Sequence, residues 1–325
     1  MPRQTRPLTK KMCDKYHDKP NRFVARALHA ADPREYPSIE RARDAVRFYR
    51  GQSGKQSKAT AIQRGTLKLP TAVLPPPYLD EWKRVNIDSK KTLLLSDIHV
   101  PYHDLLALQT AIDYGKYFKP DTIIINGDML DYYRASRFPK SKNRPTIVDE
   151  LTAANQFLRY LRQQFTKQRI IYKFGNHDER YEAYVMEHAP ELIGVVDDAW
   201  RGILGITEYK IETYTDQEIL DVNGLPVLHG HELPKGMTNP VGAARGAFLR
   251  TVESCVVGHY HQTSAFTART AFSGRIIATH SMGCLCQLSP KYARINQWNH
   301  GLATVEKSGA GYVLENKRIV DGKVY

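Results

Sequence analysis

The chain has 325 residues, 42% of them hydrophobic and 25% charged, which suits one large globular domain or such a domain with an appendage. It contains no run of about 18 apolar residues, and its basic N-terminus has no apolar stretch of the kind found in secretory signals. We therefore expect a soluble, cytoplasmic protein without a membrane partner. The four cysteines are Cys13, Cys255, Cys284 and Cys286. They form no CxxC pair, which argues against a disulfide framework or a zinc finger.

The positive charge is concentrated near the N-terminus. The formal net charge is +13, and residues 1–91 account for +12 of it, with 21 Lys and Arg against 9 Asp and Glu. A basic segment joined to a nearly neutral body is typical of an appendage that binds a polyanion. Nucleic acid is the expected partner, because binding it releases counterions, and a solvated basic tail is the alternative.

Two short helices are predicted within this basic segment. Residues 21–32 carry apolar side chains at helical spacing, and residues 39–50 follow the N-cap residue Ser38 and end before Gly51. Together they suggest a small helical unit of the helix-turn-helix kind. The second helix carries a stripe of arginines that we expect to contact nucleic acid, with a solvated helix face as the alternative: Arg43, Arg47 and Arg50.

Composition predicts three segments along the chain. Residues 1–68 form the basic helical appendage, in which residues 51–58 are expected to be flexible. Residues 69–90 read as a proline-rich linker. Residues 91–325 then form the main domain, of the α/β class.

Strands and helices alternate at the start of the main domain. Apolar runs predict strands at residues 91–97, 121–127 and 169–175, and helical periodicity predicts helices at 105–118 and 148–165. This alternation predicts a largely parallel sheet with right-handed crossovers. A helix is expected near 240–250, and further strands are expected at 209–216, 218–230, 254–261 and 274–280. Two sheets covered by helices fit this pattern best.

Ligand-type side chains follow five of these strands. Because the carboxyl ends of parallel strands open on one crevice, we expect the five endings to share a site. Each ending alone has a simpler explanation, an Asx-turn or a solvent-exposed histidine. The whole set combines oxygen and nitrogen ligands that suit Mn, Fe or Zn. The endings are Asp97-Ile98-His99, Gly127-Asp128-Met129-Leu130-Asp131, Gly175-Asn176-His177-Asp178, His229-Gly230-His231 and Gly258-His259-Tyr260-His261.

These endings, DIH, GDMLD, GNHD, HGH and GHYH, resemble the five-motif signature of the calcineurin-like metallophosphoesterases. All five occur in the family order within residues 97–261, and SDIHVPYHD is similar to the first motif of members from phages and bacteria. The resemblance implies a four-layer α-β-β-α sandwich and a metal-dependent hydrolase of phosphoric esters. It also implies two divalent cations, with Mn²⁺ favoured and Fe, Zn or Ni as alternatives.

The resemblance further implies the roles of individual residues. One cation would bind Asp97, His99, Asp128 and His261, and the other would bind Asp128, Asn176, His229 and His259. Asp128 would therefore bridge the two. His229 is favoured as the fourth-motif ligand because it ends the strand, and His231 stays open as the alternative. A metal-bridged hydroxide would attack phosphorus, while His177 would stabilise the transition state or protonate the leaving group, oriented by Asp131.

Residues beside the motifs are weaker candidates. We expect substrate contacts from Tyr102, His103, Arg134 and Arg180, although surface solvation explains each of them equally well. Cys284 and Cys286 are expected to pack in a strand rather than bind metal, because thiolates do not suit an oxygen-rich site.

The fold does not choose the substrate, but the basic appendage favours nucleic acid. The leading prediction is a phosphodiesterase or nuclease, or an end-processing phosphatase. A phosphatase or phosphodiesterase for small molecules or phosphoproteins is the alternative, and a nucleic-acid binding protein with an inactive metal centre is a third. The oligomeric state has no signal in the sequence.

Overall fold

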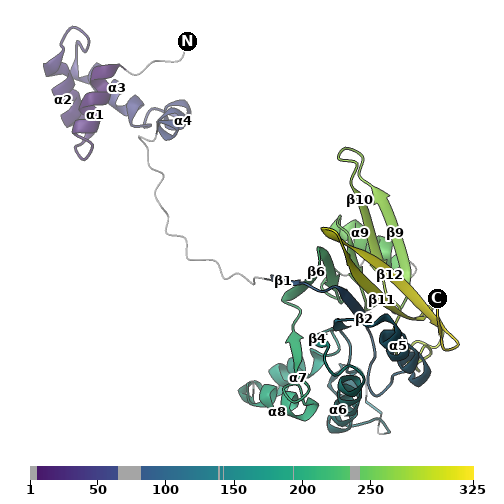
Figure 1. Cartoon of the computed structure of the whole chain (residues 1–325). Helices are drawn as coiled ribbons and strands as arrows, with labels where there is room; N and C mark the ends of the chain where they lie inside the picture. The colour runs from purple at the N-terminus through teal and green to yellow at the C-terminus, as the bar shows by residue number, and fades with distance from the viewer. Residues whose placement is uncertain (1–5, 65–81, 138–139, 142, 193, 235–241) are drawn as a thin grey trace. The chain divides into compact units, whose positions relative to one another are not determined.

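The computed structural model describes residues 6–64, 82–137, 140–141, 143–192, 194–234 and 242–325. The chain divides into two compact units, Met1–Leu79 and Asp80–Tyr325, whose elements are labelled in Figure 1. Each unit contains its own cluster of buried hydrophobic side chains. The two units are described separately below.

The described part of the N-terminal unit is helical. Its core holds Val24, Leu28, Tyr36, Val46 and Tyr49, all buried. Ser38 caps the third helix by accepting a hydrogen bond from the backbone N–H of Arg41, as predicted. The helices are α1 (Pro7–Lys15), α2 (Asn21–Ala31), α3 (Ile39–Tyr49) and α4 (Lys55–Gln63).

Two features of this unit bear on its predicted form. Helix α4 begins within the segment 51–58, and the Ser57 hydroxyl bonds the backbone of Ser53 and Gly54. The connection between α2 and α3 spans residues 32–38, which is longer than the three or four residues of a helix-turn-helix turn.

The predicted arginine stripe on α3 separates into structural and exposed members. Arg50 donates to the carbonyl oxygens of Tyr16 and Lys19, each at 2.7 Å, and thereby holds the connection between α1 and α2. This use of its donors gives Arg50 a structural role within the unit. Arg43 is half-buried, with Nη1 3.5 Å from the Glu40 carboxylate, and Arg47 is exposed.

The second unit contains two β-sheets. The seven-stranded sheet has the order β13-β12-β11-β2-β3-β4-β5. Strands β2, β3 and β4 are parallel, as predicted; β5 is parallel to β4, and β11 is antiparallel to β2. The six-stranded sheet has the order β1-β6-β7-β8-β10-β9. The strands are β1 (Lys83–Ile87), β2 (Lys91–Leu95), β3 (Thr122–Asn126), β4 (Arg169–Lys173), β5 (Ile211–Tyr214), β6 (Glu218–Val222), β7 (Leu225–Leu228), β8 (Cys255–Val257), β9 (Ser264–Arg269), β10 (Ile276–Ser281), β11 (His300–Ser308), β12 (Gly311–Val320) and β13 (Lys323–Val324).

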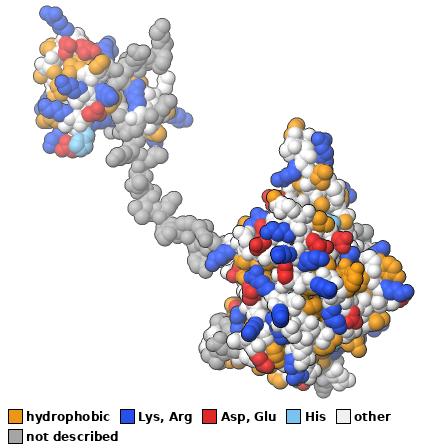
Figure 2. All heavy atoms as spheres, in the orientation of Figure 1, with side chains coloured by type: hydrophobic (Ala, Val, Ile, Leu, Met, Phe, Trp, Pro, Cys, Tyr) orange, Lys and Arg blue, Asp and Glu red, His pale blue; other side chains and the backbone are white. Residues whose placement is uncertain are grey.

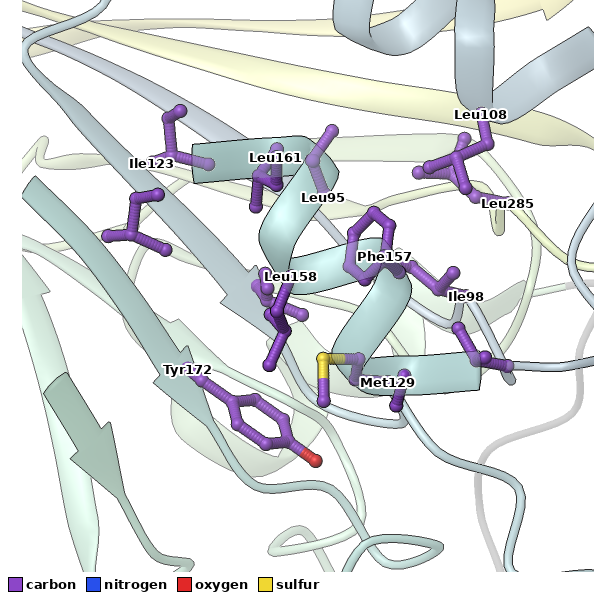
Figure 3. Close-up of a cluster of buried hydrophobic side chains, with 14 of the residues drawn as sticks. Leu95, Ile98, Leu108, Ile123, Met129, Phe157, Leu158, Leu161, Tyr172 and Leu285 are labelled. Atoms are coloured by element: carbon purple, nitrogen blue, oxygen red, sulfur yellow. The ribbon is translucent and has the colours of Figure 1, made fainter. Parts of the chain in front are cut away.

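Side-chain alternation along the strands separates two cores. Leu93 and Leu95 of β2 pack with α5 (Leu105–Phe118) and α6 (Ile147–Gln164), whereas Leu94 packs with strands of the second sheet. Figure 3 shows the first core, in which Phe157, Leu158 and Leu161 of α6 lie close to the strand side chains. Helix α9 (Ala243–Thr251) covers the other face of the second sheet. The layers are therefore helix, sheet, sheet and helix.

The main domain begins earlier than predicted. Strand β1 lies within the range 69–90 assigned to the linker, but it pairs in parallel with β6 and buries Ile87. The proline-rich part of that linker lies outside the described residues. Helices α7 (Arg180–His188) and α8 (Val195–Leu204), with the 3₁₀ turns η1 (Tyr133–Ala135) and η2 (Pro190–Leu192), were not predicted.

Candidate metal centre

The seven predicted metal ligands lie on loops that follow the carboxyl ends of β2, β3, β4, β7 and β8. Five of them have left-handed backbone conformations, with φ between 50° and 65°: Asp97, His99, Asp128, His259 and His261. Such conformations are uncommon for residues other than glycine, and they turn each chain sharply at the end of its strand. The loops thereby direct ligands from both sheets toward one point.

Asp128 lies at the centre of this cluster. Its Oδ2 is 3.3 Å from Nε2 of His229 and 3.7 Å from Nε2 of His99, and only 1% of the residue is exposed. Two groups of potential ligand atoms share this carboxylate, one with His99 and His177 and one with His229 and His259. The geometry therefore matches a carboxylate placed between two cation positions.

Asp97 and His261 form the neighbouring part of the cluster. The Asp97 Oδ1 atom is 3.0 Å from Nε2 of His261, which is in turn 3.3 Å from Nε2 of His99. The other carboxylate oxygen, Oδ2, accepts hydrogen bonds from the Ser96 hydroxyl at 2.5 Å and from the backbone N–H of His259 at 3.0 Å. These bonds fix Asp97 and leave Oδ1 directed at the imidazoles.

Hydrogen bonds outside the cluster orient two of the imidazoles. Nδ1 of His229 lies 2.9 Å from the carbonyl oxygen of Asn126, and Nδ1 of His99 lies 3.1 Å from Oδ1 of Asp131. A donor proton on each Nδ1 leaves the Nε2 lone pair free and pointing inward. Histidines that bind metals in proteins are commonly held in this way.

The cluster fits divalent cations by three observations. Asp97 Oδ1, Asn176 Oδ1 and His229 Nε2 are all buried and have no hydrogen-bond partner. A Cβ at Gly175 would overlap the Asp128 carboxylate, and one at Gly127 would overlap the His229 ring, so both glycines make room for ligands. Burial lowers the pKa of His229, but the nearby carboxylates of Asp128 and Asp97 raise it to about 10. The raised pKa reflects an excess of negative charge around the imidazole, which bound cations would offset.

His177 and Asp131 lie beside the cluster. The Asp131 Oδ1 atom is 3.1 Å from Nδ1 of both His177 and His99, so that one carboxylate orients two imidazoles. The His177 backbone N–H donates to Asp128 at 2.8 Å. Arg180 donates to His177 Nε2 at 2.6 Å and to the Asp131 carbonyl at 3.0 Å, which brings this predicted substrate contact into the site.

The other predicted substrate contacts have structural partners. Arg134 donates to the carbonyl oxygens of Pro145 and Arg144 and so holds the loop before α6. The ring of Tyr102 lies 5.0 Å from the Arg144 guanidinium, and its hydroxyl is buried. His103 forms a backbone bridge with Cys286, and burial lowers the pKa of its imidazole.

His229, and not His231, is the fourth-motif residue whose Nε2 lies close to Asp128, at 3.3 Å from its Oδ2. The Nε2 atom of His231 lies instead 3.4 Å from Glu179, outside the dinuclear cluster. Cys284 and Cys286 are buried, but they lie in isolated β-bridges and not in a strand. The Cys286 sulfur is 3.8 Å from Nδ1 of His261, and a ligand-type atom of Cys286 lies within 4.8 Å of those of His99 and His261.

A buried ion pair positions the fourth motif. The Glu232 carboxylate accepts the backbone N–H groups of His229 at 3.1 Å and Gly230 at 2.6 Å, and it pairs with Lys173 Nζ at 2.8 Å. The Lys173 side chain is fully buried at the end of β4. This pair was not predicted, although the lysine at the end of the apolar run RIIYK indicates a buried charge that needs a partner.

Asp178 has a comparable role in the second and third motifs. Its Oδ1 accepts the backbone N–H of Leu130 at 2.9 Å, and its Oδ2 accepts that of Gly175 at 2.8 Å. One carboxylate thereby ties the loop after β3 to the loop after β4. This residue orients the loops that carry Asp128 and Asn176.

Comparison with known proteins agrees with this geometry. Residues 90–261 match the family model for calcineurin-like phosphoesterases. The chain belongs to this family. The calcineurin-like phosphoesterases to which it belongs are metal-dependent phosphoric ester hydrolases, so the predicted enzyme class and fold are confirmed. In the part of the chain that the structure describes, no helix combines the length and apolar character needed to cross a membrane.

The chain is similar to two phage proteins and, more distantly, to a solved structure. The chain is 25% identical over 247 residues to the Gene 54 protein of Mycobacterium phage L5, covering 72% of this chain and 96% of that protein. It is 26% identical over 189 residues to the Gene 54 protein of Mycobacterium phage D29, covering 54% and 70%. Vacuolar Protein Sorting 29 from Cryptosporidium parvum is 13% identical, with a TM-score of 0.41, covering 73% of this chain and 95% of that one.

Replacing Lys173 by Met should destabilise this phosphoesterase strongly. The change leaves the Glu232 carboxylate buried without its charged partner, and breaking such a pair costs about 3–5 kcal/mol. Urea unfolding of the wild type and the variant measures the difference. The double variant Lys173→Met/Glu232→Gln should lose less of the free energy of unfolding, because no unpaired charge remains. A loss below about 1 kcal/mol in the single variant would contradict this role of the pair.

Proposed function

We propose that this phosphoesterase hydrolyses phosphoester bonds of nucleic acid, as a nuclease or an end-processing phosphatase. The observation that carries the proposal is a cavity of about 1330 Å³ whose lining includes Asn176 and His259 of the metal-ligand cluster. Most small-molecule sites occupy about 300–1,000 Å³, so this space suits a longer substrate.

The lining of the cavity suits a polyanion with aromatic bases. Arg137, Lys140 and Arg180 supply positive charge for phosphates, and Tyr184 and Tyr260 supply rings on which bases stack. The acidic residues Glu179 and Glu187 also line the cavity. The cavity therefore combines a charged path with aromatic surfaces next to the predicted cations.

The chemistry divides between the cations and the protein side chains. When bound, two divalent cations supply an activated water at neutral pH and neutralise charge on the phosphoryl oxygens. Asp97, His99, Asp128 and His261 would hold one, and Asp128, Asn176, His229 and His259 the other. Mn²⁺ is our proposed metal, because carboxylate and amide oxygens with imidazole nitrogens suit it.

His177 is placed for proton transfer to the leaving group. Its Nδ1 faces Asp131 at 3.1 Å, which leaves Nε2 directed into the site, 3.9 Å from Oδ2 of Asp128. In this structure Arg180 donates to the same Nε2, so this hydrogen bond must break before Nε2 can carry a proton to the leaving group. The released guanidinium is then available to bind a phosphoryl oxygen. We assign proton transfer to His177, its orientation to Asp131 and phosphate binding to Arg180.

The N-terminal unit is proposed as a second contact with nucleic acid. Arg41 and Arg47 are exposed on α3, and Arg34 lies beside Arg41 around a cavity of about 530 Å³. Figure 2 shows Lys and Arg side chains on the visible face of this unit, interspersed with acidic and hydrophobic ones. These exposed arginines take the place that the sequence assigned to Arg50.

A substrate panel tests the proposed activity. With Mn²⁺, the protein should cleave single-stranded, nicked or linear DNA, or RNA, faster than it cleaves phosphopeptides or cyclic nucleotides. A chelator should abolish the hydrolysis of bis-(p-nitrophenyl) phosphate, and added Mn²⁺ should restore it. The variant His177→Asn should keep its metal content and lose about 10²–10⁴-fold in turnover, whereas His17→Asn, at an exposed histidine of the N-terminal unit, should not. Preference for phosphopeptides, or no hydrolysis with any metal, would overturn the proposal.

Charge reversal on α3 tests the second contact. Arg41→Glu/Arg47→Glu should weaken DNA binding. The plot of log affinity against log salt has a negative slope, and this slope should become less steep by about 2, because two phosphate contacts are lost. The matched control Arg159→Glu/Arg269→Glu changes the same number of exposed arginines in the second unit. Equal effects of the two double variants in fluorescence anisotropy titrations would refute a specific role for α3.

A further inference from the structure

A second group of ligand-type side chains lies outside the dinuclear cluster. It consists of Glu179, Asp216 and His231, whose ligand atoms all lie within 4.8 Å of one another. Glu179 precedes α7, Asp216 lies in the turn between β5 and β6, and His231 follows β7. Three segments that are distant in sequence thus place two carboxylates around one imidazole.

The imidazole of His231 lacks a hydrogen-bond partner at both nitrogens. Both atoms are buried from water, and so is the unpartnered Oε1 of Glu179. The Nε2 atom is 3.4 Å from Oε2 of Glu179, but the two groups do not have hydrogen-bond geometry. Unsatisfied buried polar atoms are costly and call for a ligand or an ion to satisfy them.

Glu232 places a carboxylate near the opposite nitrogen of this imidazole, although the two groups form no hydrogen bond in this structure. The Nδ1 atom of His231 faces Oε2 of Glu232 at 3.6 Å, on the side of the ring away from Glu179. A proton on Nδ1 leaves the Nε2 lone pair directed toward Glu179 and Asp216. Imidazoles that bind metals commonly have an outer carboxylate on the opposite nitrogen.

We propose that Glu179, Asp216 and His231 bind a third divalent cation, of the Mn²⁺ or Zn²⁺ class. Two carboxylates and a neutral imidazole carry a charge of −2, which matches a divalent cation, and the mixed oxygen and nitrogen donors suit these metals. Water completes the coordination. The binding of this cation does not depend on which phosphoester is the substrate.

The position of the site gives the cation a role toward substrate. Glu179 and His231 line the same cavity as Asn176 and His259, two predicted ligands of the dinuclear pair. An anionic group that flanks the reacting phosphate would meet the third cation in this cavity. We infer that the third cation binds substrate, whereas the dinuclear pair acts on the reacting phosphate.

Crystals of the full-length protein grown with Mn²⁺ test the proposal, because anomalous difference maps locate each bound cation. Calorimetric titration counts the cations that bind in solution. The wild type should show three anomalous peaks and bind three equivalents of Mn²⁺. Asp216→Asn should lose the third of each and keep the other two; because Asp216 is exposed, this change leaves the fold intact. Glu187→Gln, an exposed acid in the same cavity, is the matched control and should keep all three.

Two results would overturn the proposal. One is a wild-type map with no third peak at this position. The other is a third peak that persists at this position in Asp216→Asn. Because the readout is metal location, failure of the nucleic-acid activity would leave this test unaffected.

Discussion

The structure of the site depends on one buried carboxylate, that of Asp128. Its Oδ2 lies within 3.9 Å of ring nitrogens from His99, His177 and His229, which come from three different loops. Two cations held close together repel one another, so a shared negative charge between them is required. The left-handed backbone of Asp128 and the absence of a side chain at Gly175 give this carboxylate its place.

The two sheets bring the other ligands to this carboxylate. The ends of β2, β3 and β4 supply Asp97, Asp128 and Asn176 from one sheet, while β7 and β8 supply His229 and His259 from the other. Leu94 and the side chains packed around it join the sheets beneath the site. The hydrophobic core between the sheets therefore fixes the distance between the ligand sets.

Periodicity and strand order made the main features of this site predictable. The run of leucines before Asp97 identified a buried strand, and parallel strands necessarily end at one edge. Contacts between distant residues were not predictable: Arg50 and Arg134 look like free cations in the sequence, yet both donate to backbone carbonyls. The partner of Lys173 is 59 residues away, and no local pattern connects it to Glu232.

Both cations of the pair are proposed to depend on the same carboxylate. The most direct test is the metal content of Asp128→Asn, measured by plasma mass spectrometry after equilibration with Mn²⁺ at a concentration that saturates the wild type. We expect the bound Mn²⁺ to fall by two equivalents relative to the wild type, because each cation of the pair loses the carboxylate ligand that it shares with the other. A fall of one equivalent or less would contradict this.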